Sequence, residues 1–315
     1  MQGFRSIFMT SAMLALAGWT TAQADLVSHY DAGTITGASD LAPVNLWKDL
    51  SGNGNDATST GTPRYLVDGI GGRPSVLFNR GDQGFVSSLL LGSQFGIQGD
   101  ASWSMVAVFR PTSFSTQYGV AAMGWLGTTF HGVGIEMDGA NLDLALGHGD
   151  DLRLRPDGSF SPFLNQDVIV IFSHIGGTGG SVLSTTELMI NGYRPGEGIL
   201  SGIALQALRT AGSTPLNLAN NPVVLGGALV AGNSSFDGLL SEFSLYNHAL
   251  STAEKYRVVS SLGEKYGISV VPEPAGIVHL ATGVFLFAAV SGVQTLRRFG
   301  GKRAGARDVR ELGSA

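Results

Sequence analysis

The chain has 315 residues, of which 46 are glycine and 14% are charged, and it contains no cysteine. The absence of cysteine excludes thiolate metal sites and cysteine nucleophiles. The low charge and high glycine content argue against a helical bundle with a highly charged surface and favour short strands joined by glycine turns. Residues 25–271 carry 21 acidic and 12 basic side chains. This balance argues against a nucleic acid partner, which requires a clustered basic surface.

Residues 1–24 have the organisation of a secretory signal peptide. Arg5 supplies the positive region, an apolar stretch runs from Ile7 to Trp19, and Ala22 and Ala24 form a small-x-small cleavage site. We expect signal peptidase to remove this segment after Ala24. A retained N-terminal membrane anchor is the alternative.

No internal repeat or low-complexity linker divides residues 25–270, so one domain is the simplest organisation. Within it, Trp103, Met105, Ala107 and Phe109 alternate on one face of a predicted strand. Residues 167–175 are apolar on both faces, as in a central strand covered on two sides. The dipeptide Asn191-Gly192 predicts a hairpin turn.

A second hairpin is predicted around Asp138-Gly139. Across this turn, Val133, Ile135 and Met137 pair with Leu142, Leu144 and Leu146. Recurrent strands with almost no helical periodicity predict an all-β fold of two packed antiparallel sheets.

One short C-terminal helix is predicted from Ser251 to Tyr266. Ser251-Thr252-Ala253-Glu254 is a capping box, in which the serine hydroxyl and the glutamate carboxylate each reach a free backbone amide. Val258, Val259 and Leu262 supply an apolar face, and Gly267 is a suitable C-terminal cap.

Four blocks of sequence resemble a known family. These are HYDAG near residue 30, LWKDLSGNGNDAT at 46–58, GGRPSVLF at 71–78 and FDGLLSEFSLYNHALSTAEKYRVVSSLGEKYGI at 236–268. In this order they resemble a laminin-G-like domain of the concanavalin A-like lectin/glucanase superfamily. The resemblance implies a jelly-roll sandwich over residues 25–270.

Glucanases of that superfamily carry two glutamates and an aspartate along one strand, spaced E-x-D-x-(x)-E, so that the carboxylates converge on one glycosidic bond. Glu136 and Asp138 match the first two positions, but Ala140 and Asn141 follow where the second glutamate belongs. We therefore expect no catalytic residue and no enzymatic activity.

Two kinds of ligand site remain as candidates. Aromatic faces stack on sugar rings and carboxylates accept hydrogen bonds from hydroxyls, so a carbohydrate platform is predicted at Trp125, Glu136, Asp138 and Asp143. Asp49, Asn53 and Asn55 resemble an oxygen-rich calcium loop, but Thr60 stands where the loop's bidentate glutamate belongs. Turn formation is the alternative for that loop, and calcium is the one cofactor left open.

Residues 275–295 form an uncharged apolar segment of about 31 Å as a helix, close to one hydrocarbon core. Arg297 and Arg298 follow, which predicts a transmembrane helix with the domain outside the membrane and a basic tail, residues 304–315, inside. A buried core helix is the alternative.

The motif Pro272-Glu273-Pro274 precedes this segment. Because proline breaks a helix, the motif separates the domain from the membrane segment. Over residues 271–303, the motif, the apolar helix and the arginines resemble a PEP-CTERM sorting signal. The resemblance implies an exosortase-type processing enzyme as a partner, and a permanent single-pass anchor is the competing interpretation.

These observations predict an exported cell-envelope protein with a non-catalytic, glycan- or exopolysaccharide-binding β-sandwich. Extracellular polysaccharide or other envelope components are the expected partners. Two alternatives stay open. One is a structural or adhesive envelope protein without a small ligand, and the other is a glycoside hydrolase.

Overall fold

The computed structural model describes residues 26–79, 84–87, 95–114, 117–123, 131–146, 151–209, 213–227 and 234–271. Trp125, the predicted signal peptide with Ala22 and Ala24, and the predicted sorting segment with its transmembrane helix lie outside these ranges. Within them, no helix is both long enough and apolar enough to span a membrane.

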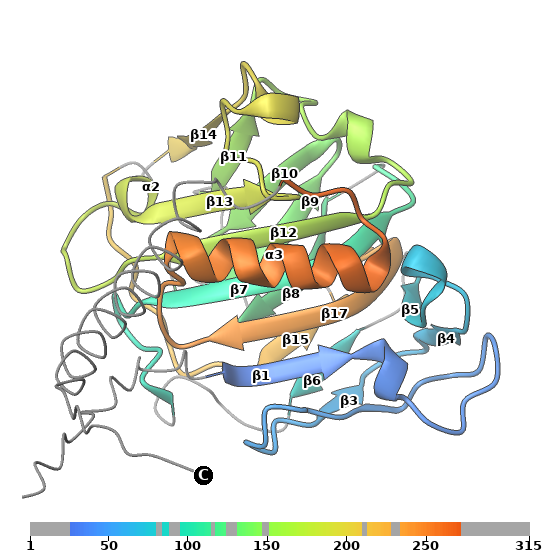
Figure 1. Ribbon diagram of the computed structural model, residues 1–315. Helices are drawn as coiled ribbons and strands as arrows, with labels where there is room; N and C mark the ends of the chain where they lie inside the picture. The colour runs from blue at the N-terminus through green and yellow to red at the C-terminus, as the bar shows by residue number, and fades with distance from the viewer. Residues whose placement is uncertain are drawn as a thin grey trace, which may run out of the picture.

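The strands in these ranges form two sheets, in agreement with the predicted architecture (Figure 1). One sheet has seven strands, in the order β13-β12-β7-β17-β5-β4, with β1 also paired to β17. Every pairing in this sheet is antiparallel. Its strands are β1 (Leu26–Asp31), β4 (Arg64–Leu66), β5 (Ser75–Phe78), β7 (Trp103–Pro111), β12 (Val168–His174), β13 (Thr186–Ile190) and β17 (Gly238–Tyr246).

The second sheet has ten strands, in the order β14-β11-β10-β9-β8-β15-β6-β3-β2, and β16 adds a parallel pairing to β8. Its strands are β2 (Leu46–Trp47), β3 (Ala57–Ser59), β6 (Phe85–Ser87), β8 (Gln117–Met123), β9 (Val133–Asp138), β10 (Asn141–Ala145), β11 (Leu152–Arg155), β14 (Ala204–Ala207), β15 (Val223–Leu225) and β16 (Ser234–Ser235).

The main core lies between the two sheets. The predicted inward face of β7 is confirmed, because Trp103, Met105, Ala107 and Phe109 all belong to this core. A chain of aromatic rings, each within 6.4 Å of the next between centroids, runs through it: Trp47, Phe85, Phe78, Phe236, Phe109, Phe160 and Phe163.

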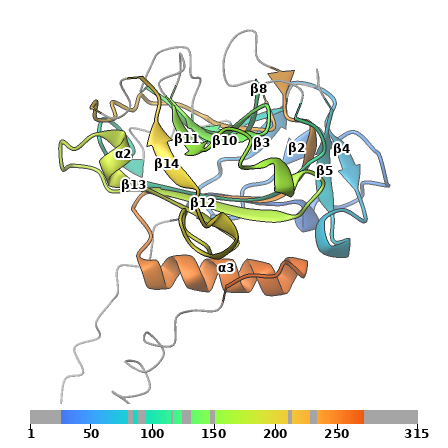
Figure 2. The same ribbon diagram turned by 90° about the horizontal axis from the view of Figure 1, so that it is seen from above.

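The other face of the seven-stranded sheet is covered by α3 (Thr252–Tyr266), which lies outside the sandwich in Figure 2. Val259 and Leu262 of α3 belong to one buried cluster with Ile169 and Ile171 of β12. All seven residues of β12 are buried, as its apolar sequence predicts. The capping box at Ser251 and the left-handed Gly267 (φ 65°) are both present.

Short helical turns connect the strands. They are η1 (Ala32–Thr34), η2 (Ile70–Gly72), η3 (Ser161–Phe163), α2 (Val182–Thr185) and η4 (Gly198–Leu200). The turn η2 meets the end of α3 closely: a Cβ on Gly71 would lie 2.0 Å from the Tyr266 carbonyl oxygen, and Gly71 has φ +58°. This contact requires glycine, because any side chain would meet the backbone of α3.

Candidate functional site

The candidate site lies on the face of the ten-stranded sheet that points away from the main core. Ile135 and Met137 of β9 face the core and pair with Leu144 and Leu142 of β10, as the sequence predicts. Because side chains alternate along a strand, the residues between them point to the opposite face. Glu136 of β9 lies there, directly across from Asp143 of β10.

An arginine from the next strand joins this pair. Arg153 of β11 is the register partner of Asp143. Its Nη2 and Nε lie 2.7 and 2.9 Å from the two carboxylate oxygens of Asp143, and Nη2 also contacts Asp138. Three predicted glycan contacts, Glu136, Asp138 and Asp143, are thus brought together. Trp125, the fourth, lies outside the described residues.

The carboxylates differ in their environments. Glu136 and Asp143 are 1% and 0% exposed, whereas the Asp138 side chain is 41% exposed. Burial raises the pKa of Asp143 to about 7, against the opposing hydrogen bonds and charge of Arg153. Burial alone would lower the pKa of Arg153, but its bonds to Asp143 and Asp138 raise it above the ordinary value. Burial thus favours the protonated form of Asp143, and the bonds from Arg153 favour its charged form.

A row of small apolar residues lies beside this charged row on the same face. Ala122 of β8, Ala145 of β10 and Val224 of β15 form a separate buried cluster, with Val86 of β6 against it. The register places Gly134 of β9 between Ala122 and Ala145. On this face, a buried apolar cluster therefore lies next to the buried carboxylates.

Opposed residues on adjacent antiparallel strands have Cβ atoms about 4.5–5.5 Å apart. Retaining glycosidases use two carboxyl groups about 5–5.5 Å apart, one as nucleophile and one as acid and base. Glu136 and Asp143 are opposed in this way across β9 and β10.

The residues of the predicted calcium loop bind the protein's own backbone. Asp49 accepts hydrogen bonds from the amides of His29 and Asn55, at 2.9 and 3.0 Å. The Asn53 and Asn55 side chains donate to carbonyls of β1. Over the described part of the chain, no three histidine, aspartate or glutamate side chains converge as metal ligands. These bonds give the three residues a structural role in holding the loop on β1.

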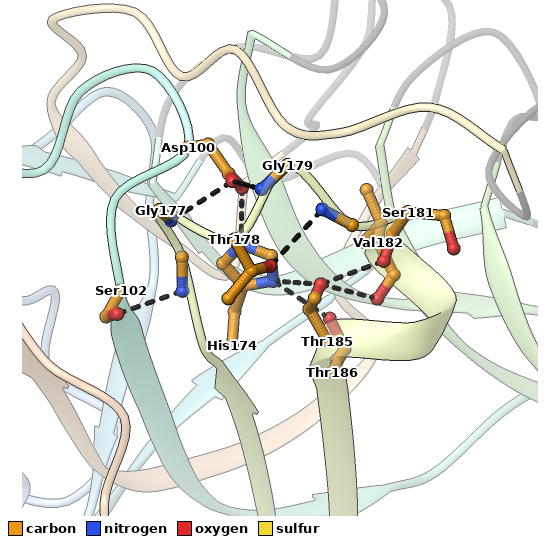
Figure 3. Close-up of polar contacts among 12 residues, drawn as sticks. Asp100, Ser102, His174, Gly177, Thr178, Gly179, Ser181, Val182, Thr185 and Thr186 are labelled. Carbon is orange, nitrogen blue, oxygen red and sulfur yellow. Dashed lines mark hydrogen bonds and ion pairs between the residues drawn. The ribbon is translucent and has the colours of Figure 1, made fainter.

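Sequence analysis missed a polar cluster around His174, at the end of β12 (Figure 3). His174 Nε2 lies 2.9 Å from an Asp100 carboxylate oxygen, and Thr185 Oγ1 lies 3.1 Å from His174 Nδ1. Because the Asp100 carboxylate accepts the proton of Nε2, Nδ1 accepts from a hydroxyl. Asp100 also accepts bonds from the amides of Gly177 and Gly179.

The order hydroxyl, imidazole and carboxylate is that of a nucleophilic triad. However, His174 is fully buried against Trp103, with ring centroids 5.7 Å apart, and burial lowers its pKa despite Asp100. The Thr185 hydroxyl lies 2.9 Å from the Ser181 carbonyl oxygen of its own helical turn. The cluster therefore acts as an anchor for the glycine-rich loop rather than as a catalytic centre.

A second missed cluster fixes α3 to the sheet. Glu242 of β17 accepts hydrogen bonds from His29 Nε2 at 2.9 Å, Lys265 Nζ at 2.5 Å and the Tyr266 hydroxyl at 2.8 Å. Lys265 also binds Asp31 of β1, at 2.7 Å. Burial alone would raise the pKa of Glu242, but these donors outweigh it and hold the pKa below its usual range.

Comparison with known proteins found no matching family model and no matching curated protein. Among solved structures, 76% of the chain matches 98% of domain 4 of a GH43 extracellular arabinanase from Geobacillus stearothermophilus, in complex with arabinotriose, at 19% identity and a TM-score of 0.48. An equal share of this chain, 76%, matches only 33% of a Trypanosoma rangeli sialidase in complex with sialic acid, at 16% identity and a TM-score of 0.49. A GH54 α-L-arabinofuranosidase matches over 79% of this chain and 60% of its own, at 13% identity and a TM-score of 0.47.

These findings correct two predictions. A non-catalytic glycan-binding function and the absence of enzymatic activity were predicted because the strand carrying Glu136 lacks a second glutamate. The expectation was wrong in its premise, because it considered a second carboxylate only along β9 itself. The carboxylate opposite Glu136 comes from the neighbouring strand, as Asp143, rather than from further along β9.

Proposed function

We propose that the protein acts on glycans as a glycoside hydrolase, with Glu136 and Asp143 as its pair of carboxyl groups. One observation carries the proposal: Glu136 lies directly across from Asp143 on the outer face of the ten-stranded sheet, and burial brings the pKa of Asp143 to about 7. A group that titrates near neutral pH suits a general acid, which must hold a proton and release it to the leaving group. Glu136 takes the role of nucleophile or base.

The neighbouring residues fit the same role. Arg153 binds Asp143 with two nitrogen atoms and so fixes the orientation of its carboxyl group. Ala122, Ala145 and Val224 form a buried apolar cluster beside the pair and keep polar groups away from it on that side. The substrate class for such a pair of carboxyl groups is an oligosaccharide or polysaccharide.

The test uses the full-length protein and a panel of 4-nitrophenyl glycosides and soluble polysaccharides, with release of nitrophenol or reducing ends as the readout. We expect Glu136→Gln and Asp143→Asn to lower turnover by about 10²-fold or more. Asp68→Asn, at an exposed carboxylate on a different loop, is the matched control and should leave turnover unchanged. Absence of cleavage by folded wild-type protein across the panel would refute the proposal.

A structural or adhesive envelope role without a small ligand is the second candidate. The observation that favours it is that Arg153 binds both Asp143 and Asp138, which makes the carboxylates part of a closed ion network. In that case Asp143→Asn would lower the melting temperature, while the wild-type protein would cleave none of the glycans.

We further propose that the domain is a laminin-G-like jelly roll, exported through residues 1–24 and sorted through the PEP-CTERM segment. The transmembrane helix 275–295 would hold the precursor until processing at Pro272-Glu273-Pro274, where the prolines keep the chain extended. The mass of the mature protein from cells with an exosortase should show loss of residues 275–315. Glu273→Ala should retain them, and retention in the wild type would instead establish a permanent anchor.

A further inference from the structure

A cavity of about 480 Å³ lies at one end of the sandwich and shares no residue with the carboxylate row. Its walls come from the turn around η3, the hairpin turn after β13, the turn η4 and the chain that follows α3. The volume falls within the range of small-molecule binding sites, roughly 300–1,000 Å³.

Two polar groups in this wall have hydrogen-bonding capacity that the described residues leave unused. The Ser159 hydroxyl oxygen is buried and has no hydrogen-bond partner. Asn191 is 8% exposed, and its side-chain oxygen accepts a bond from the Ile169 amide at 2.8 Å. Its side-chain nitrogen donates to no group in the described ranges. A buried hydroxyl such as that of Ser159 normally has a partner, so a bound molecule is expected here.

The apolar part of the wall is accessible. Ile199 of η4 is 54% exposed, the highest exposure of any large apolar side chain in the described ranges. Phe163 of η3 lines the same cavity. An apolar surface beside unused donors and acceptors suits a ligand that has both an apolar face and hydroxyl groups.

The charges of the wall exclude an ionic ligand. Among the described residues that line the cavity, Asp167 is the only charged one, and it is paired with Arg110 at 2.5 Å. An anionic ligand would face this carboxylate with no cation in the lining, and a cation would have to displace Arg110. A peptide is also disfavoured, because the lining comes from turns and helical ends and offers no open strand edge for main-chain pairing.

We infer that this cavity binds an uncharged sugar residue, at a site separate from the proposed carboxyl pair. Ser159 and Asn191 bind its hydroxyl groups, and Ile199 contacts the apolar face of its ring. The site gives the protein a second contact with a glycan and does not depend on cleavage at Glu136.

The test is calorimetric titration of the full-length protein with D-glucose, D-galactose and L-arabinose, each an uncharged probe. We expect saturable binding of at least one of them, and at least about tenfold weaker binding of the matched acids D-glucuronate and D-galacturonate. Ser159→Ala removes one hydrogen bond to the ligand and should weaken binding about three- to tenfold. Its melting temperature should not fall, because the hydroxyl bonds to no protein group.

Ile199→Ser should weaken binding by a similar factor. Ile175→Ser is its matched control, since Ile175 is 51% exposed and does not line the cavity. The inference is overturned if no uncharged probe binds saturably, if the uronates bind equally well, or if Ile175→Ser and Ile199→Ser weaken binding alike. Titration in a Glu136→Gln background separates the two sites, because binding at the cavity should persist there even if cleavage is lost or was never present.

Discussion

Glu242→Ala tests the buried charge cluster that joins α3 to the sheet. The substitution removes the acceptor shared by His29, Lys265 and Tyr266. Lys265 keeps Asp31 as a partner, but the Tyr266 hydroxyl, in a residue that is 1% exposed, loses the acceptor that it has within the described residues. Breaking a buried charge network in this way costs about 3–5 kcal/mol, which corresponds to a fall in melting temperature of roughly 6–20 °C for a domain of this size.

The pH dependence of stability follows from the same bonds. The folded state holds the pKa of Glu242 below its ordinary value of 4.5. A depressed folded pKa contributes stability that is fully present above the unfolded pKa and is lost as the pH falls through the folded pKa. The difference in unfolding free energy between wild type and Glu242→Gln should therefore be largest near pH 7 and should shrink below about pH 4.5.

Urea unfolding followed by far-ultraviolet circular dichroism, repeated between pH 3 and pH 8, measures both effects. Glu264→Ala, an exposed carboxylate on the same helix, is the matched control and should change stability by less than about 0.5 kcal/mol. A loss below about 1 kcal/mol for Glu242→Ala would refute the reasoning. So would a difference between wild type and Glu242→Gln that does not shrink in acid.

Three further predictions use the same unfolding assay. Asp143→Ala should cost about 3 kcal/mol because it removes the fully buried carboxylate that binds Arg153 with both oxygens, whereas Asp138→Ala, at the exposed end of that network, should cost about 1 kcal/mol or less. Ser251→Ala removes the helix cap and should cost about 1 kcal/mol. Gly71→Ala should cost about 3 kcal/mol because its Cβ would meet a backbone carbonyl of α3, while Gly52→Ala, with open space around it, should cost about 1 kcal/mol.

Local patterns predicted much of the fold. The alternation in β7, the two-sided burial of β12 and the capping box of α3 are each set by neighbours in the sequence, and the structure confirms all three. The turn at Gly139 also gave the correct register, with Ile135 opposite Leu144. The same register implies that Glu136 faces Asp143, but a search for carboxylates along a single strand overlooked the pair.

The other clusters could not be predicted, because their partners are distant in the sequence. His174 and Asp100 are separated by 74 residues, and His29 and Glu242 by 213. No periodicity or spacing links such positions. Only the pairing of the strands brings them together, and burial then favours hydrogen-bonded partners over unpaired ones.

The position of β17 has a consequence for the order in which the protein can fold. This strand, residues 238–246, pairs with β1, β5 and β7, all of which precede it in the chain. A ribosome would therefore synthesise almost the whole domain before the strand that joins these three could enter the sheet. Until then β1, β5 and β7 cannot form their pairings with β17, because a non-local pairing requires that both strands have been synthesised. The seven-stranded sheet of the nascent chain thus stays incomplete until β17 is made, and an incompletely folded polypeptide can be threaded through a narrow translocation channel.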